Sequence, residues 1–152
     1  MKPDPSITVE LQTLGALLRT PLEAAVDHVY GGLAKAGFAE IRLAHGDVFR
    51  HLSRHGSRIT TLAERAHMTK QSMAELVEYL SRHGFVELVA DPSDGRAKLV
   101  KFTARGWKVH YTLVRLSKAY ERKCARSMGQ EKWRQLRALL QEFAAWSVQQ
   151  RE

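Results

Sequence analysis

Four consecutive polar residues, Thr69-Lys70-Gln71-Ser72, stand at the predicted start of a helix and could hydrogen-bond to a nucleic acid. Lys70 can donate to a phosphate or a guanine edge, Gln71 can pair with adenine, and Ser72 can reach a base or a phosphate. Glu75, one turn further along, could accept from cytosine N4. An ordinary capped surface helix carries the same residue types, so these residues alone leave both interpretations open.

A second polar group follows in the turn Asp91-Pro92-Ser93-Asp94-Gly95-Arg96. The long cation of Arg96 suits the narrow minor groove of DNA, where the negative potential is enhanced. Asp94 could hold the Arg96 guanidinium by a charge-assisted hydrogen bond, and Lys98 adds a cation just behind the turn. The alternative is a solvated turn with an incidental ion pair.

The spacing of apolar residues predicts two short helices that position the first polar group. Thr60 or Thr61 can cap the first helix, and Glu64 is placed for a capping box with Thr61. Thr69 can cap the second helix, which is expected to run to about Arg82. The four polar residues therefore form its exposed first turn.

Two strand-like runs, at 86–90 and 98–102, follow this helix after Gly84. The turn that contains Pro92 and Gly95 joins them as an antiparallel hairpin. The order helix, turn, helix, strand, turn, strand is that of a winged helix-turn-helix, a unit that reads DNA.

Longer helical patterns flank this unit. The first is expected to start at Ile7 and to be kinked or broken in two by Pro21. A second helix is predicted over residues 38–52. Thr103 can cap a long helix after the hairpin, and Gly129 separates that helix from the last one.

The expected fold is therefore mainly α, a winged helix-turn-helix with a small antiparallel β-hairpin as its wing and helices at both ends. The helices within 7–36 and 104–150 carry apolar stripes that have to be buried, either within the chain or against a second copy; the family resemblance described below implies the second. We expect these two ranges to form a dimerisation region and residues 38–103 to form the DNA-binding domain.

Composition bounds the class of protein. A chain of 152 residues, 44% hydrophobic and 26% charged, suits one folded domain or one domain with an appendage. No apolar run is long enough to span a bilayer, and the first residues lack the apolar core of a secretory signal. With one cysteine, Cys124, an internal disulfide is excluded, and the cytoplasm is the expected location.

The formal net charge of +8 favours a polyanionic partner without choosing among nucleic acid, a membrane surface and an acidic protein. Residues 1–95 hold 10 Lys and Arg against 12 Asp and Glu, a net charge of −2. Residues 96–152 hold 14 against 4, a net charge of +10. Because the excess lies after the Asp-Pro turn, DNA recognition has to rest on shape and specific side chains.

Signatures of catalysis are missing from the sequence, which has no glycine-rich phosphate loop, no Gly-x-Ser-x-Gly and no His-Glu-x-x-His. Neither catalytic residues nor a cofactor is expected. His51 and His55 stand four residues apart and could chelate zinc, but without a nearby acidic or cysteine partner the pair is interpreted as exposed helix residues. Cys124 could sense oxidants, and an inert helix cysteine is the favoured interpretation.

The segment from Ile59 to Thr103 resembles the multiple-antibiotic-resistance regulator (MarR) family. Its most specific signal is the Asp-Pro-x-Asp-x-Arg turn, followed by a strand and Thr-x-x-Gly. The matching residues are Leu62-Ala63-Glu64, Thr69-Lys70-Gln71-Ser72, Leu76-Val77-Glu78-Tyr79-Leu80, Gly84-Phe85-Val86, Asp91-Pro92-Ser93-Asp94-Gly95-Arg96 and Phe102-Thr103-Ala104-Arg105-Gly106. The flanking helices match the family only in pattern.

The resemblance implies a homodimeric transcriptional regulator, usually a repressor, that binds a pseudo-palindromic operator. It implies that Arg96 enters the minor groove and that residues 70–72 face the major groove. The alternative is a ligand-independent architectural DNA-binding protein, which would lack a strong sequence preference.

Members of the family often bind a small effector, frequently aromatic and anionic, between the dimer helices and the DNA-binding domain. An aromatic lining with a few cations suits an aromatic carboxylate, although core packing explains each apolar residue equally well. The walls that correspond in this chain are Tyr30, Phe38, Arg42, His45, Phe49, Trp107 and Tyr111.

Overall fold

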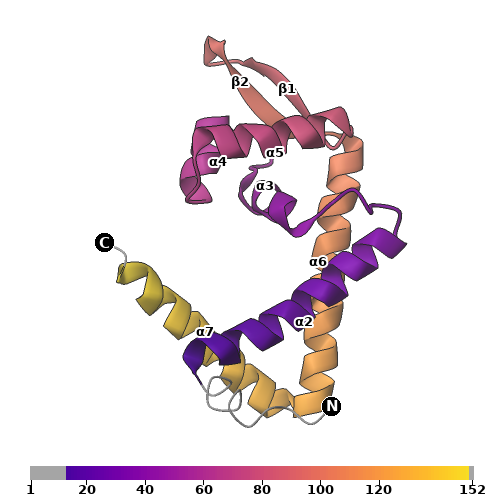
Figure 1. Cartoon of the computed structure of the whole chain (residues 1–152), viewed down its shortest axis with the longest axis vertical. Helices are drawn as coiled ribbons and strands as arrows, with labels where there is room; N and C mark the ends of the chain where they lie inside the picture. Colours follow the sequence, from indigo (N-terminus) through magenta and orange to yellow (C-terminus); the bar gives the residue numbers. More distant parts are fainter. Residues whose placement is uncertain (1–12, 151–152) are drawn as a thin grey trace. The chain divides into compact units, whose positions relative to one another are not determined.

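The computed structural model describes residues 13–150, which divide into two compact units, one up to Leu116 and one from Ser117 onward. The elements of the described chain are helical except for one hairpin (Figure 1). Their order is α2 (Leu14–Lys35), a 3-10 turn η1 (Leu43–His45), α3 (Gly46–His51), α4 (Ile59–Arg65), α5 (Lys70–Arg82), β1 (Val86–Asp91), β2 (Asp94–Phe102), α6 (Ala104–Met128) and α7 (Gln130–Gln149).

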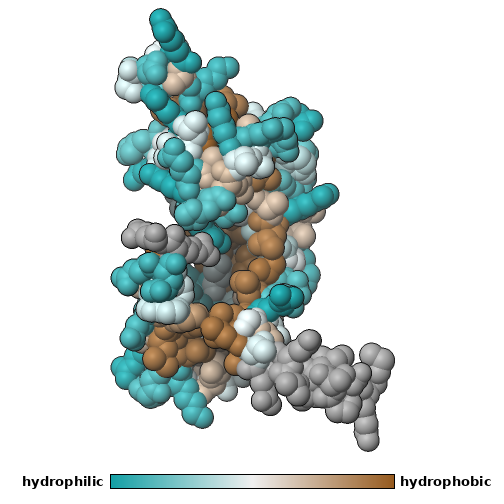
Figure 2. Space-filling view, turned by 60° about the vertical axis from the view of Figure 1, so that its left-hand side comes forward, coloured by the Kyte–Doolittle hydropathy of each residue, from teal (hydrophilic) through white to brown (hydrophobic). Residues whose placement is uncertain are grey.

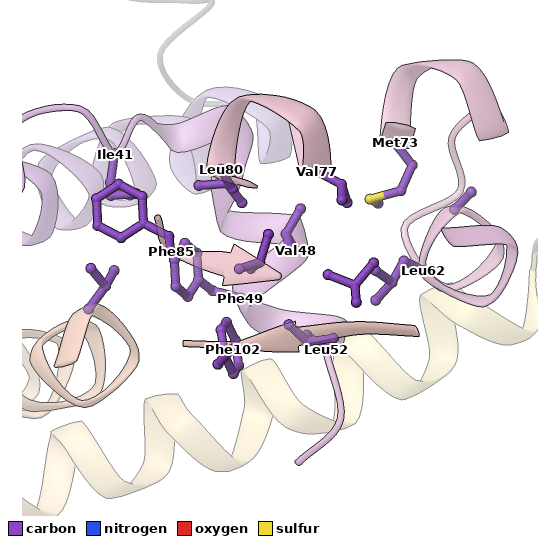
Figure 3. Close-up of a cluster of buried hydrophobic side chains, with 14 of the residues drawn as sticks. Ile41, Val48, Phe49, Leu52, Leu62, Met73, Val77, Leu80, Phe85 and Phe102 are labelled. Atoms are coloured by element: carbon purple, nitrogen blue, oxygen red, sulfur yellow. The ribbon is translucent and has the colours of Figure 1, made fainter. Parts of the chain in front are cut away.

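A single apolar core holds the first unit together (Figure 3). Helix α5 contributes Met73, Val77 and Leu80, which recur at helical spacing and are at most 1% exposed. Phe85, directly before β1, is fully buried in the same cluster. Burying each such side chain stabilises the fold by roughly 1.5–3 kcal/mol, so the helix-turn-helix and the hairpin fold as one body.

The wing is an antiparallel hairpin in which Val86 pairs with Phe102 at the base and Asp91 pairs with Asp94 at the turn. Val100 and Phe102 of β2 point into the core, as the two-residue period of a strand requires. Ser57, outside the two-stranded hairpin, forms an isolated antiparallel bridge with Val100 near the base of the wing.

Local sequence signals predicted several elements correctly. Helix α5 begins after Thr69 and ends at Arg82, as expected from its cap and its apolar spacing. The hairpin lies where the two strand-like runs place it. The helices α6 and α7 meet at Gly129, whose φ of 90° suits glycine. The mainly α winged-helix class predicted from the sequence is confirmed.

The single helix predicted over residues 38–52 is wrong. Gly37, with a φ of 90°, ends α2, and the amide of Phe38 donates to the Leu33 carbonyl. Phe38 then packs edge-to-face on Phe85, and Ile41 is only 4% exposed. These tertiary contacts hold the segment in turns, so that regular helix begins only at Leu43.

Two further expectations need correction. Helix α4 begins at Ile59 with Arg58 as its cap residue, so neither Thr60 nor Thr61 caps it. The bridge of Ser57 to the wing sets this earlier start. Helix α2 continues through Pro21 without a break, because a proline removes one hydrogen bond and the rest of a 22-residue helix remains. The expected start at Ile7 lies outside the described residues.

Candidate nucleic-acid interface

The first turn of α5 presents the predicted polar group to solvent. The Thr69 hydroxyl oxygen accepts from the Ser72 amide at 3.1 Å, and the Thr69 hydroxyl donates to the Ser72 hydroxyl oxygen at 2.9 Å. Gln71 donates from its side-chain amide to Glu75 at 3.4 Å. All these residues and Lys70 are exposed. The Thr69 cap thus holds the backbone of this turn, and the side chains of the turn are exposed to solvent, as a base-reading surface requires.

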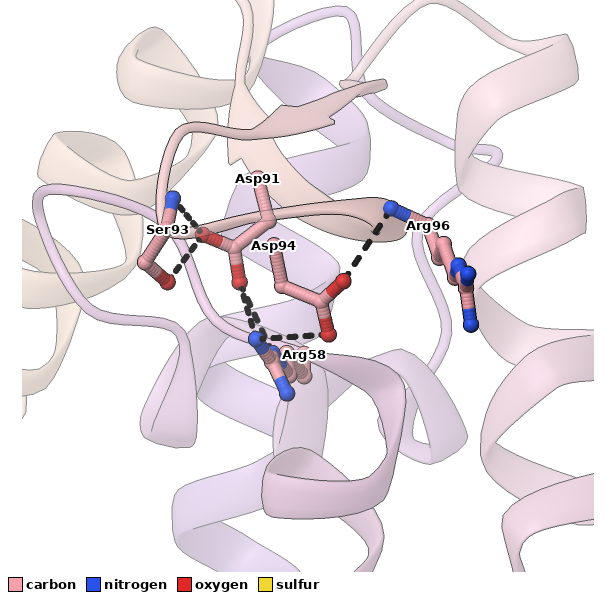
Figure 4. Close-up of polar contacts among 5 residues, drawn as sticks. All are labelled: Arg58, Asp91, Ser93, Asp94 and Arg96. Carbon is pink, nitrogen blue, oxygen red and sulfur yellow. Dashed lines mark hydrogen bonds and ion pairs between the residues drawn. The ribbon is translucent and has the colours of Figure 1, made fainter.

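The expected partner of Arg96 is different in the structure. Asp94 accepts from the backbone amide of Arg96 at 3.1 Å and does not hold the guanidinium. A short aspartate side chain readily bonds the backbone two residues on. The other oxygen of Asp94 faces Arg58 at 3.6 Å. The side chain of Arg96 therefore extends away from Asp94 (Figure 4) and is exposed, as is that of Lys98.

An interaction that was not predicted ties the wing turn to the start of α4. Arg58 donates from Nε to Asp91 Oδ2 at 2.8 Å, and a second guanidinium nitrogen lies 2.6 Å from the same oxygen. Asp91 Oδ1 accepts from the amide and the hydroxyl of Ser93 at 2.9 and 2.7 Å. Arg58 and Asp91 are 33 residues apart, so no local spacing signal could have found the pair.

These bonds stabilise the ionised form of Asp91. The hydrogen bonds from Ser93, followed by the bond from Arg58, lower the pKa of Asp91 from 3.8 to about 2. The carboxylate is 7% exposed, so solvent screens the contacts little. Asp91 therefore stays charged throughout the range in which the protein would bind DNA.

We expect Asp91→Asn to lower the free energy of unfolding at neutral pH and to leave a smaller acid dependence. Because the folded pKa of about 2 lies below the usual 3.8, the stabilisation is complete above pH 3.8 and is lost as the pH falls to 2. Urea unfolding of both proteins should give a difference that is constant from pH 7 to about 4 and then shrinks. Ser93→Ala should show a smaller effect in the same direction. A difference that persists undiminished at pH 2 would contradict the assignment.

Three of the seven residues expected to line an effector pocket are connected by ring contacts, since Phe49 stacks on Phe102 and Phe102 packs edge-to-face on Trp107. Phe38 packs in the core on Phe85 and Phe49 is 4% exposed, whereas Arg42 is exposed. Trp107 stacks on Tyr111, whose side chain is 65% exposed.

His45 is buried against α5. Its ring stacks on Tyr79 of α5 with centroids 4.5 Å apart, and its Nδ1 accepts from the Arg42 amide at 3.0 Å. Burial, the charge of Arg42 and the nearby His83 lower the pKa of His45. A neutral His45 is therefore part of the packing between η1 and α5.

Tyr30 does border a cavity in the first unit, of about 430 Å³, between α2 and the η1–α3 segment. The cavity also carries the carboxylates of Glu23, Asp27 and Asp47 and the guanidinium of Arg50. Burial raises the pKa of the Tyr30 hydroxyl. The lining is therefore apolar with an excess of negative charge.

No group of three or more His, Cys, Asp or Glu suited to a metal ion occurs within residues 13–150. Cys124 is half-buried in α6. Over the same part of the chain, no helix combines the length and apolar character needed to cross a membrane.

The geometry defines a winged helix-turn-helix whose recognition turn and wing arginine are both exposed. Residues 41–97 match the model of the MarR family. Over these residues the chain is similar to the MarR family of transcription regulators. No curated protein matches the chain.

Solved structures share the fold over nearly the whole chain. A crystal structure of MarR is 20% identical, covers 99% of this chain and 98% of its own, and has a TM-score of 0.75. The transcriptional repressor CouR, bound to a 23-mer DNA duplex, is 17% identical with 95% and 99% covered and a TM-score of 0.73. PcaV from Streptomyces coelicolor, in complex with its natural ligand, is 23% identical with 88% and 93% covered and a TM-score of 0.66.

Proposed function

We propose that this chain is a homodimeric, sequence-specific transcriptional regulator that represses by occupying a pseudo-palindromic operator. The observation that carries the proposal is the exposed polar first turn of α5, on the same folded unit as the exposed Arg96 of the wing. In this proposal Thr69, Lys70, Gln71, Ser72 and Glu75 face the major groove. Arg96 enters the minor groove, Asp94 supports the wing turn, and Lys98 contacts the backbone. Such a regulator acts in the cytoplasm, beside its DNA.

Exposed apolar side chains on the flanking helices support the homodimer. On α2, Leu17 and Leu22 are 59% and 63% exposed, and on α7, Leu139 and Trp146 are 63% and 54% exposed. Figure 2 shows hydrophobic side chains open on the surface over the flanking helices. Helix α7 buries none of its residues. Large apolar side chains exposed on a helix are typical of a protein interface, so we keep residues 7–36 and 104–150 as the dimerisation region and 38–103 as the DNA-binding domain.

The proposal includes release from the operator by a small aromatic effector. The CouR and PcaV structures carry DNA and a natural ligand, respectively. In this chain the cavity beside Tyr30 holds three carboxylates and one arginine. That charge favours a neutral or cationic aromatic molecule over the aromatic carboxylate expected from the sequence, because an anion would meet net repulsion there.

Selection from a pool of random DNA duplexes tests the proposed function. We expect the full-length protein to enrich an inverted repeat with half-sites about one helical turn apart, and to bind it at least about a thousandfold more tightly than scrambled DNA. In sedimentation the free protein should have twice the chain mass of 17.2 kDa. Tight binding without enrichment would instead identify an architectural DNA-binding protein, and a monomer would exclude the dimeric regulator.

A further inference from the structure

Arg58 lies between the helix-turn-helix and the wing. It is the cap residue of α4, and its side chain is 41% exposed. No side-chain hydrogen bond of its own caps the helix. Its guanidinium instead faces both aspartates of the wing turn, Asp91 at 2.6 Å and Asp94 at 3.6 Å (Figure 4). The Arg58 side chain thus contacts the wing turn and does not cap the helix that it precedes.

The backbone before Arg58 is also attached to the wing. The Ser57 amide donates to the Val100 carbonyl at 3.0 Å, and the Val100 amide donates to the Ser57 carbonyl at 2.9 Å. Gly56, with a φ of 99°, approaches β2 so closely that a Cβ atom would lie 3.0 Å from the Val100 oxygen and 2.9 Å from Lys101 Cγ. The segment 56–58 therefore contacts the wing at its base through the backbone and at its turn through Arg58.

A continuous set of polar contacts connects Arg58 to the backbone of Arg96. Arg58 contacts one oxygen of Asp94, and the other oxygen accepts from the Arg96 amide at 3.1 Å. The same guanidinium holds Asp91, which fixes Ser93 within the turn. The position of the Arg96 backbone thus depends on Arg58, whereas the Arg96 side chain remains extended toward solvent.

We propose that Arg58 is a positioning residue for DNA recognition, which fixes the wing turn so that Arg96 enters the minor groove at a defined base step. This inference rests on the proposed function. A simpler role would be neutralisation of Asp91 and Asp94, whose charges would repel DNA phosphates. The two roles predict different results for Asp91→Asn. If Arg58 only neutralises the aspartates, removing a negative charge strengthens binding to DNA. If Arg58 positions the wing turn, the same substitution weakens the selection of base pairs in the minor groove.

The first measurement needs no DNA. Hydrogen exchange of the full-length protein should be at least about tenfold faster at residues 93–96 in Arg58→Ala, because Asp91 and Asp94 lose the cation that holds them. Exchange within α5 should be unchanged. Arg58→Lys should lie between the two proteins, because it keeps the charge and loses the forked geometry. Unchanged exchange in the turn of Arg58→Ala would overturn the proposal whether or not the protein binds DNA.

The second measurement uses the duplex that the wild-type protein enriches, with A·T or G·C pairs at the positions where Arg96→Ala loses selectivity. Wild-type protein should prefer A·T there by about tenfold, and both Arg58→Ala and Asp91→Asn should reduce that ratio to less than about threefold. Arg54→Ala, at an exposed arginine in the loop before Gly56, is the matched control and should keep the wild-type ratio. Thermal melts would confirm folding of each variant.

The outcomes separate the two hypotheses. If Arg58→Ala keeps the wild-type preference and Asp91→Asn simply binds all duplexes more tightly, Arg58 acts by charge and the positioning role is wrong. If the wild-type protein enriches no duplex, the proposed function fails and the DNA role of Arg58 fails with it. In that case the exchange measurement still reports whether Arg58 holds the wing turn.

Discussion

Gly106→Ala should lower the free energy of unfolding by about 3 kcal/mol, near the upper end of the effects seen when a packed site is overfilled. Gly106 lies in the first turn of α6, directly against the chain before β1. A Cβ atom there would lie well inside van der Waals contact of the Phe85 carbonyl oxygen, and 3.0 Å from the Phe102 ring. That carbonyl also accepts from the Thr103 amide at 3.1 Å, so it cannot retreat without breaking the junction between the wing and α6.

Thermal unfolding followed by circular dichroism measures the effect, at one protein concentration because a dimer's melting temperature depends on it. The melting temperature should fall by roughly 10 °C for a chain of this size. The matched control is Gly15→Ala in α2, where no atom lies within 4 Å of the added methyl group. That variant should be as stable as the wild type or slightly more stable, since alanine is the better helix former. Equal melting of the two variants would show that the contact at Gly106 is not restrictive.

Arg96→Ala is expected to weaken operator binding by roughly 10- to 100-fold, which corresponds to about 1–3 kcal/mol. The side chain is exposed, and the carboxylate of its neighbour Asp94 contacts the Arg96 backbone amide and the Arg58 guanidinium. Its removal should therefore leave the fold and the dimer intact. Selectivity should be lost at the flanks of the operator and retained at the positions read by α5, because the two elements contact different grooves.

Gel-shift titration with the enriched duplex measures the affinity, and sedimentation confirms the dimer. Lys98→Ala is the matched control on the same strand. As a phosphate contact, it should weaken binding to all sequences alike and reduce the salt dependence by about one ion. Wild-type affinity of a folded, dimeric Arg96→Ala protein would exclude the minor-groove role.

Helix α5 and the hairpin could be predicted because their signals are local. Thr69 bonds an amide three residues away, and the apolar side chains of α5 repeat every three or four residues. The turn at Asp91 and Asp94 likewise satisfies its own backbone. Where the hydrogen bonds and apolar contacts of a segment are made within a few residues, sequence spacing is sufficient evidence of its structure.

The segment 38–45 shows the opposite case. Its apolar residues fit a helical pattern, yet from a turn conformation Ile41 is buried in the core and the half-buried Phe38 packs against it. The Tyr79 hydroxyl donates to the Glu40 carbonyl at 3.1 Å across 39 residues. Burial against distant elements here outweighs the local preference for helix.

Spacing along the chain was enough to predict the winged-helix class, from the cap and polar first turn of α5, the wing with Arg96 at its turn, and the apolar stripes of the flanking helices. How these parts are held together became evident from the packed fold. It showed that Asp94 bonds the backbone of Arg96, and that the cation near the turn comes from Arg58, 33 residues before Asp91. The Arg58–Asp91 pair could not be predicted because it depends on the packing of β2 against Ser57. Such packing between distant segments leaves no periodic pattern in the sequence.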